Sequence, residues 1–505
     1  MSFSPRYEDT VETEEDINEL TNAYEGFLDF LRKRFSRKEK FGLTFTIRIL
    51  LIVFFVFLFL SILQDYRAYD PLIRADVRIV NLFYTFRSDT LTNVMLFFTN
   101  LGTWQVVFTG IIVIGFSLFA LNLLPYLCAL IISVSGGEII VAIIKHLVRR
   151  PRPPSISAFL LDHSFSFPSG HSFVAMSFYG LLAYIMYRMS DKKISKIIAI
   201  VGGIVIIAAI AVSRIYLGLH WPSDIFASFT LGGAWLTLII TILELQKNSP
   251  WSQESAKLIG KKFIIVPSIV LLLLWFAYMG YYLFTTHSLT PQIAIIQNPL
   301  YIKEADIPQS LFAVLPRSSE TLSGAPMNPI NIVIVGNYEE LINTFESTGW
   351  VQPESITLRS GWRNIIASIL NKPYPRAIEA PSFWNSRPND FAFQLPTTTI
   401  RQRHHIHFWA TPLLTDNGHR VWFATAHFDK AVNLRTIIPT HTIDPYVDNE
   451  REIIKNDILG TGQVSLIEEL QVVNPGKGKN LSGDTFVTDG KAFVLFLKDS
   501  RASKL

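Results

Sequence analysis

Long apolar runs alternate with short polar segments over the first 284 residues of this 505-residue chain. Each run has about the 20 residues that an α-helix needs to cross the hydrocarbon core of a bilayer. The runs cover residues 41–63, 104–124, 125–147, 171–189, 194–213, 225–245 and 263–284. We therefore expect seven membrane-spanning helices, six of them in one bundle. Residues 64–102 alternate charged and apolar positions, which predicts amphipathic helices along the membrane interface.

Residues 285–505 change character, with strand-like runs, prolines and few long apolar stretches. The sequence Asn-Ile-Val-Ile-Val at 331–335 indicates a buried strand. Two alternating segments, 401–409 and 420–427, flank the turn at 416–418, and this arrangement predicts a pair of strands. We therefore predict a soluble α+β domain in this part of the chain.

The patterning divides the chain into four parts. We expect a cytoplasmic N-terminal segment at 1–40, a membrane domain at 41–245, a loop with a seventh transmembrane helix at 246–284 and a soluble extracytoplasmic domain at 285–505. The composition agrees, because 49% of the residues are hydrophobic and mean hydropathy is +0.31. The net charge of only +4 gives no support for a nucleic-acid partner. The lone cysteine, Cys128, rules out a disulfide within the chain.

Basic residues concentrate at 32–40, 188–196 and 247–262, which fall on one side of the membrane if there are seven spans. Cytoplasmic loops carry an excess of Lys and Arg, so this side should be cytoplasmic. Arg149 and Arg150 fall on the far side, against this rule, and we interpret them as charges that face lipid headgroups rather than as catalytic residues.

Two polar clusters mark the ends of neighbouring apolar runs. Lys145 and Arg152 are seven residues apart, which is about two helical turns, so both cations can point the same way. Pro168-Ser169-Gly170-His171 leads directly into an apolar run and indicates a turn that feeds a helix N-terminus. Such a terminus presents free backbone N–H groups and is a ready anion site.

A third cluster lies between the next two apolar runs. Ser213-Arg214 is followed by His220 and Asp224. An acid four residues after a histidine can fix the tautomer of the ring and stabilise its charged form. Together the three clusters predict a phosphate-handling site at the membrane boundary.

The combined pattern K-x6-RP, PSGH and SR-x5-H-x3-D resembles the signature of the type-2 phosphatidic acid phosphatase superfamily, the lipid phosphate phosphatases that share their site with vanadium-dependent haloperoxidases. The resemblance implies that His220 attacks phosphorus to form a phosphohistidine, that Asp224 holds its other ring nitrogen and that His171 is the general acid. It also implies a site without metal or other cofactor. The phosphate-binding residues that it implies are Lys145, Arg152, Ser169, Gly170 and Arg214.

We expect a multi-pass lipid phosphatase of the bacterial inner membrane, with the site and the C-terminal domain on the periplasmic side. Its substrate would be a phospholipid or a polyprenyl (di)phosphate within the bilayer. A lipid phosphotransferase with the same intermediate is the alternative. A membrane-anchored binding or scaffold protein that acts through its soluble domain is another. A haloperoxidase is disfavoured, because the site lies among membrane spans.

The soluble part resembles the LssY C-terminal-type domain, which occurs fused to such phosphatase cores in bacteria and implies no established chemistry. The segments that carry the resemblance are 328–331, 349–350, 403–409 and 441–445. His405 and His407 share one strand face. Other possible metal ligands are His404, His427, His441, Asp444 and Asp448. A zinc-type site needs three or four ligands to converge. We interpret these side chains as a polar cluster and assign no metal.

Overall fold

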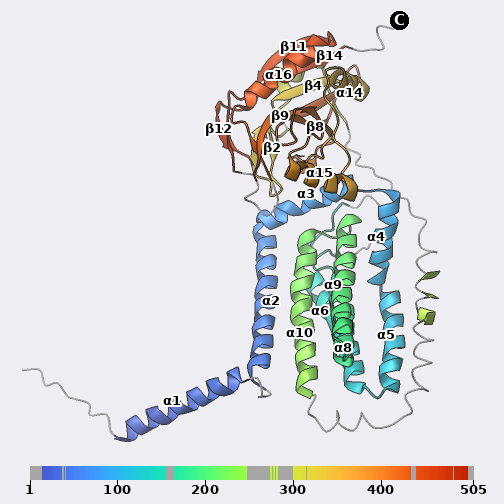
Figure 1. The fold of residues 1–505 in the computed structure, drawn as a ribbon, viewed down its shortest axis with the longest axis vertical. Coiled ribbons are helices and arrows are strands. Elements are labelled where there is room, and N and C mark those ends of the chain that lie inside the picture. The colour runs from blue at the N-terminus through green and yellow to red at the C-terminus, as the bar shows by residue number, and fades with distance from the viewer. Residues whose placement is uncertain are drawn as a thin grey trace, which may run out of the picture.

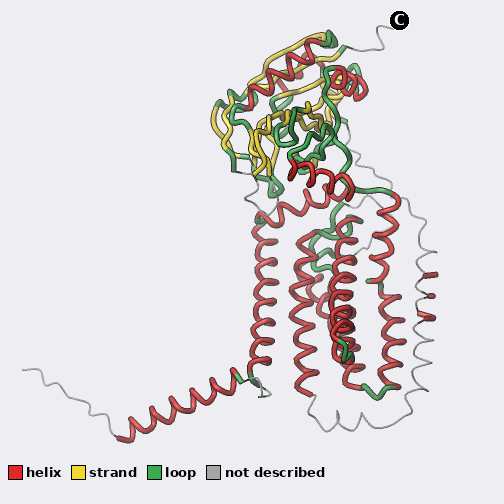
Figure 2. Tube along the Cα trace, in the orientation of Figure 1, coloured by secondary structure: helices red, strands yellow, loops and turns green. Residues whose placement is uncertain are grey.

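The computed structural model describes residues 14–36, 39, 41–154, 164–246, 273–275, 277–278, 280–281, 299–313, 315–433, 440–480 and 483–498. A bundle of helices and a sheet-rich domain form two separate bodies, one above the other in Figure 1. Figure 2 shows the same division by secondary structure, with the strands confined to the upper body. The predicted fold class, a helical membrane core followed by a C-terminal α+β domain, is confirmed.

The described part of the chain up to Gln246 is entirely helical apart from its loops. Its elements are α1 (Glu14–Phe35), α2 (Leu43–Ala68), α3 (Pro71–Thr85), α4 (Asp89–Leu101), α5 (Trp104–Ala120), α6 (Leu124–Val148), α7 (Gly170–Ala175), a π-helical turn (Met176–Gly180), α8 (Leu181–Met189), α9 (Lys193–Tyr216) and α10 (Pro222–Gln246).

Four of these helices, α2, α6, α9 and α10, are long and apolar enough to cross a membrane. Helices α4 and α5 pass the same test together, bent by 50°, so up to five spans are found among the described residues. The predicted span at 171–189 is a continuous helical run from α7 through the π-helical turn to α8. The predicted seventh span lies largely outside the described residues. The chain is therefore a multi-pass membrane protein.

Residues 64–102, between the first two predicted spans, were expected to form only helices along the membrane interface. The structure agrees with this expectation for one helix and differs for the other. Helix α3 is short and amphipathic and buries one face, as expected. Helix α4 instead forms, together with α5, a bent apolar pair that fits either a broken span or a re-entrant loop. The reason is visible in its composition, because Asp89 is the only charged residue of α4 and sits in its first turn.

Two glycines allow the close approaches that bring the helix ends together. A Cβ on Gly137 of α6 would clash with the ring of Phe173 on α7. Gly218, in the turn between α9 and α10, has a positive φ of 70°, a backbone conformation that glycine adopts without strain. These positions set how α6 meets α7 and how α9 turns back into α10.

An eight-stranded sheet forms the centre of the soluble domain, in the order β1-β8-β9-β4-β14-β11, with β7 beside β8 and β10 beside β9. Its strands are β1 (Leu300–Ile302), β4 (Ile332–Gly336), β7 (Phe391–Pro396), β8 (Arg403–Thr415), β9 (Arg420–Asn433), β10 (Thr440–Ile443), β11 (Val464–Gln471) and β14 (Lys491–Leu497). Strand β4 is buried throughout, and β8 pairs antiparallel with β9. Both strand predictions are confirmed.

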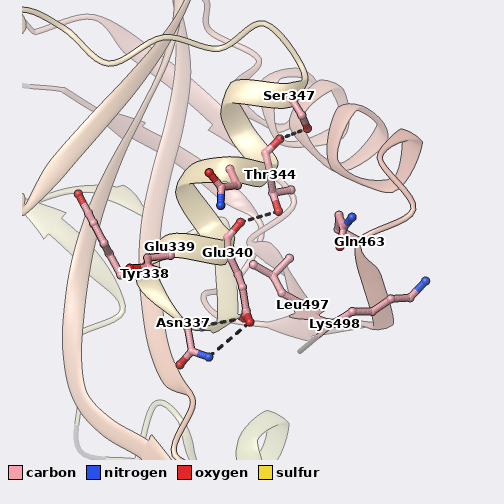
Figure 3. Close-up of a pocket in the computed structure, with 10 residues that line it drawn as sticks. Asn337, Tyr338, Glu339, Glu340, Thr344, Ser347, Gln463, Leu497 and Lys498 are labelled. Atoms are coloured by element: carbon pink, nitrogen blue, oxygen red, sulfur yellow. Dashed lines mark hydrogen bonds between the residues drawn. The ribbon is translucent and has the colours of Figure 1, made fainter. Parts of the chain in front are cut away.

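Smaller elements complete the domain. A second sheet contains β2 (Ser318–Glu320), β3 (Pro326–Pro329), β5 (Phe383–Trp384) and β6 (Arg387–Pro388), and a third pairs β12 (Gly476–Lys479) with β13 (Thr485–Thr488). The helices are α13 (Ile307–Ser310), α14 (Tyr338–Ser347), α15 (Leu358–Leu370) and α16 (Val447–Gly460). Helix α14 starts directly after β4, where the Glu340 carboxylate accepts a hydrogen bond from the backbone N–H of Asn337, beside a surface pocket (Figure 3).

Helix α3 connects the two bodies. Nη2 of Arg78 lies 2.6 Å from Oε2 of Glu320 on β2, and the Asn81 side chain donates to the Ser386 carbonyl at 2.7 Å. Figure 1 shows α3 lying between the soluble domain and the end of the bundle. The soluble domain therefore sits over the bundle end to which α3 belongs.

Candidate active site

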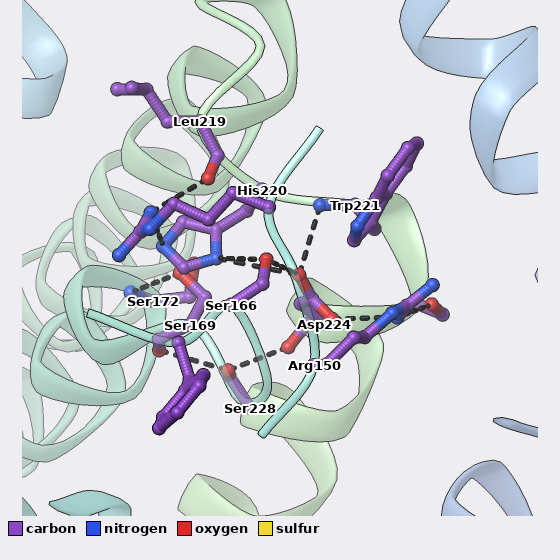
Figure 4. Close-up of polar contacts among 12 residues, drawn as sticks. Arg150, Ser166, Ser169, Ser172, Leu219, His220, Trp221, Asp224 and Ser228 are labelled. Carbon is purple, nitrogen blue, oxygen red and sulfur yellow. Dashed lines mark hydrogen bonds and ion pairs between the residues drawn. The ribbon is translucent and has the colours of Figure 1, made fainter. Parts of the chain in front are cut away.

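The three predicted clusters meet at this same end of the bundle. The first cluster straddles the C-terminus of α6, with Lys145 in its last turn and Arg152 in the loop beyond it. The second begins α7, and the third spans the turn from α9 into α10. Backbone and side-chain contacts connect them, since the Ser169 N–H donates to the Asp224 carbonyl at 3.4 Å and the Ser228 hydroxyl donates to the Ser169 carbonyl at 2.9 Å. Figure 4 shows these groups gathered around His220 and Asp224.

His220 is buried, and its two ring nitrogens face different partners. Nδ1 lies 3.3 Å from the Ser166 hydroxyl and 3.4 Å from Oδ2 of Asp224. Nε2 lies 3.1 Å from Nη1 of Arg152. Because a guanidinium only donates hydrogen bonds, Nε2 must be the acceptor. In the neutral ring the proton is therefore on Nδ1, and Nε2 carries a lone pair.

The Asp224 carboxylate is held from several sides in the first turn of α10. Oδ2 accepts a hydrogen bond from the Ser166 hydroxyl and another from the Trp221 N–H at 3.0 Å. Oδ1 lies 2.7 Å from Nη1 of Arg150. Ser166, fully buried between the histidine and the acid, was not predicted. The sequence offered no signal for it beyond its place three residues before Ser169.

The prediction that Arg150 faces lipid headgroups is wrong, because its side chain points into the protein. Its side chain is 5% exposed, and Nη2 lies 2.6 Å from Oδ2 of Asp76 while Nη1 reaches Asp224. The cause is local, since Arg149 ends α6 in a left-handed conformation with φ of 52°. That turn leaves Arg149 exposed and directs the next side chain inward.

Asp76 brings α3 into this network. Its Oδ1 accepts from the Ser223 N–H at 2.9 Å, and its Oδ2 accepts from the Ser223 hydroxyl. Burial raises the pKa of the Asp76 carboxyl, and the positive charge of Arg150 acts in the opposite direction. Asp76 lies on the same buried face of α3 as Ile73 and Val80. An acid within an apolar stripe was the sequence signal that could have identified it.

A cavity of about 810 Å³ opens next to His220 between α5, α6 and α7. One end is polar and is lined by Lys145, Arg152, Gly170, His171 and His220. The rest is mainly apolar, with Trp104, Val107, Phe108, Ile111, Ile131, Val134, Val141 and Val174 in its wall. A cationic end joined to an apolar wall suits an amphiphile with an anionic head.

The other predicted residues lie outside the lining of this cavity. The Ser169 hydroxyl accepts from the Ser172 N–H at 3.5 Å and so caps the start of α7. Nη1 of Arg214 donates to the Thr99 hydroxyl at 2.8 Å. Both side chains are buried. The structure thus brings five of the eight predicted residues to the cavity wall, with Asp224 directly behind His220.

Two family models match separate parts of the chain. Residues 123–247 match the model of the PAP2 superfamily, and residues 312–492 match that of the LssY C-terminus. Phosphatidylglycerophosphatase B of Bacillus subtilis (strain 168) is 28% identical over 179 residues, which cover 35% of this chain and 87% of that protein.

One solved structure is also similar, that of a transmembrane PAP2 type phosphatidylglycerolphosphate phosphatase from Bacillus subtilis. It shares 26% identity over 39% of this chain and 94% of its own, with a TM-score of 0.33. The chain therefore carries a PAP2 superfamily domain in its membrane core and an LssY C-terminal domain after it.

Proposed function

We propose that this protein is a membrane lipid phosphatase that removes phosphate from a phospholipid or a polyprenyl (di)phosphate through a phosphohistidine at His220. The observation that carries the proposal is the orientation of the His220 ring, whose Nε2 lone pair lies at the polar end of the cavity. The similarity to a phosphatidylglycerophosphatase supports the same class of substrate.

We assign phosphate binding to the positively charged residues at the polar end of the cavity. Lys145 and Arg152 line the cavity beside His220, and both bring positive charge to the oxygens of a phosphoryl group. Gly170 begins α7, so its backbone N–H lies at the positive end of a helical run. Arg214 supplies further positive charge, and Ser169 holds the turn from which Gly170 starts. These contacts strengthen as negative charge grows on the oxygens during transfer.

The chemistry then proceeds in two steps. Nε2 of His220 attacks phosphorus, an N–P bond forms, and the bond to the lipid oxygen breaks as His171 donates a proton to that oxygen. Asp224, with Ser166, holds Nδ1–H and stabilises the positive charge that develops on the ring. Water next attacks phosphorus while His171 takes its proton, and the N–P bond breaks to release inorganic phosphate and restore His220.

Orientation follows from the loop charges. The loop between α8 and α9 lies at the bundle end opposite the site. It contains Lys192, which directly precedes Lys193, the first residue of α9. We place that end in the cytoplasm and the site, together with the soluble domain, on the periplasmic side of a bacterial inner membrane.

The test is phosphate release by the purified full chain in detergent from a panel of phosphatidylglycerophosphate, phosphatidic acid and polyprenyl diphosphate. We expect release from at least one lipid by the wild type and by an Arg149→Ala control, and none by His220→Ala. Failure of the folded wild type on the whole panel would contradict the proposal. Transfer of phosphate to an added lipid alcohol in place of release would instead identify a phosphotransferase.

A further inference from the structure

A second buried group of ionisable side chains lies in the soluble domain, far along the chain from the membrane site. Its members are Glu379, His405, His407, His427 and Asp429. The histidines and Asp429 belong to the paired strands β8 and β9, and Glu379 precedes β5. His405 and His407 share a face of β8, as their spacing predicted.

The register of β8 and β9 places His405 opposite His427, and Arg403 opposite Asp429. The His405 and His427 rings are 4.0 Å apart between centroids. His405 is 2% exposed and Asp429 is 1% exposed. Two imidazoles and one carboxylate are thus held together on rigid, neighbouring strands inside the domain.

Three atoms of this group have the spacing of metal ligands. Nε2 of His405 lies 3.1 Å from Oδ1 of Asp429, and Nε2 of His427 lies 4.0 Å from the same oxygen. Metal bonds of about 2.0–2.2 Å in tetrahedral geometry separate two ligand atoms by roughly 3.2–3.6 Å. The two measured distances fall on either side of that range, so small side-chain shifts would bring all three atoms onto one ion.

The orientation of His405 also indicates an ion. Among the described residues neither of its ring nitrogens makes a hydrogen bond, although Nε2 is at hydrogen-bonding distance from Asp429. Buried polar atoms in proteins nearly always have such a partner. Ligands of one metal ion point at a common centre and not at one another, which accounts for short contacts that lack the alignment of hydrogen bonds.

Glu379 completes the surroundings of His405. Its Oε1 lies 3.6 Å from Nδ1 of His405, on the opposite side of the ring from Asp429. A carboxylate at the second nitrogen is the usual means by which a metal-bound histidine is oriented. Nη2 of Arg403 lies 3.4 Å from Glu379 and 3.9 Å from Asp429, and its charge reduces the repulsion between the two acids.

A route to this group exists from outside. Glu379 lines a cleft of about 730 Å³ between the soluble domain and the bundle, which is also bordered by residues 85–88 at the end of α3 and by residues 352–357. An ion can therefore reach the carboxylate of Glu379 without crossing the sheet.

We propose that His405, His427 and Asp429 bind one divalent transition-metal ion of the zinc type, with Glu379 as the residue that positions His405. Two imidazole nitrogens and one carboxylate oxygen form a donor set that such ions prefer, and they leave a fourth position for water or another ligand. A second triad contains Glu379, His405 and His407, with distances of 3.6 and 4.0 Å between Oε1 of Glu379 and the histidine nitrogens. The distances alone do not separate the two triads, and we assign the ion to the first because its three residues all lie on the paired strands β8 and β9, whereas Glu379 lies in a loop before β5.

The test is elemental analysis of the tag-free full chain in detergent, after removal of metal with a chelator and reloading with zinc. We expect one zinc ion per wild-type chain. His405→Ala, His427→Ala and Asp429→Asn should each weaken zinc binding by about 100-fold or more, and Glu379→Gln by about 10- to 100-fold. His404→Ala is the matched control, because His404 lies on the other face of β8 with Nδ1 2.8 Å from Oε2 of Glu450.

Two controls keep the outcome clear. Near-ultraviolet circular dichroism reports whether each variant is folded, and the shift of the wild-type unfolding temperature on addition of zinc needs no variant. Wild-type protein that binds no stoichiometric zinc and shows no shift would overturn the proposal. Equal loss in His404→Ala would show that the effect is not specific to the proposed ligands and would also overturn the proposal. Loss in His407→Ala with retention in His427→Ala would place the ion in the triad of Glu379, His405 and His407 and refute the ligand assignment.

Discussion

The membrane core and the soluble domain each bury histidines beside carboxylates, but the two clusters are connected differently. In the core, hydrogen bonds run without interruption from Arg152 through His220, Ser166, Asp224 and Arg150 to Asp76. In the soluble domain His405 lies between two carboxylates and makes no hydrogen bond to either. The first arrangement fixes the tautomer of His220, the proposed nucleophile, whereas the second converges on a point that an ion could occupy.

The largest expected effect separates the two clusters directly. His220→Ala should lower phosphate release by about 1,000-fold or more, because the attacking nitrogen is lost. Zinc content should stay the same, since His220 belongs to the membrane core. Parallel phosphate and metal assays on one preparation check both statements. Substantial remaining release by the folded variant would mean that another group attacks phosphorus.

Removal of Arg150 is expected to have the next largest effect. Arg150→Ala leaves Asp76 and Asp224 buried without their shared cation, and breaking such a buried pair costs about 3–5 kcal/mol. Arg149→Ala, one residue earlier and exposed, should change stability by less than about 0.5 kcal/mol. Thermal unfolding in detergent measures the two variants side by side. Similar unfolding temperatures for both would contradict the assigned role of Arg150.

A topology experiment tests whether the two clusters share a compartment. With Cys128 replaced by serine, single cysteines at Asp191 and Asn417, both exposed, would be treated with a membrane-impermeant maleimide on cells whose outer barrier is opened. We expect at least about ten-fold more labelling at position 417, because positively charged loops stay in the cytoplasm. Equal protection of both positions would place the soluble domain in the cytoplasm.

Chelation should produce the smallest change in activity. EDTA is expected to leave phosphate release unaltered while it removes zinc from the soluble domain, because the proposed phosphoryl chemistry uses only side chains. Orthovanadate should inhibit release, since its trigonal-bipyramidal adduct resembles the transition state that Lys145 and Arg152 stabilise. Loss of release in EDTA that magnesium or zinc restores would contradict the metal-independent scheme.

The sequence identified the membrane cluster well because its residues lie close to helix ends in recognisable motifs. Lys145, Arg152, His171 and His220 all line one cavity. Arg150 and Asp76 were not, because their ion pair joins positions 74 residues apart. These two side chains meet because α3 packs against the end of α10 and because the chain turns at Arg149. The spacing of residues along the sequence predicts neither feature.

In the soluble domain the strand face of His405 and His407 could be read from alternation alone. The carboxylates of the cluster could not, since Asp429 depends on the register of β8 against β9 and Glu379 on a distant loop. Three of the other suggested ligands have different partners. His404 contacts Glu450, Asp444 pairs with Lys430, and Asp448 accepts from Thr488. The side chain of His441 lies outside the described residues.

The proposed covalent phosphate on Nε2 of His220 can be trapped by rapid quenching with a radiolabelled lipid phosphate, followed by mapping of the labelled peptide. We predict one acid-labile, alkali-stable phosphate per active site, located on His220, and no label on His220→Ala. Release of inorganic phosphate without a labelled protein at any quench time, or label that persists in His220→Ala, would contradict the account.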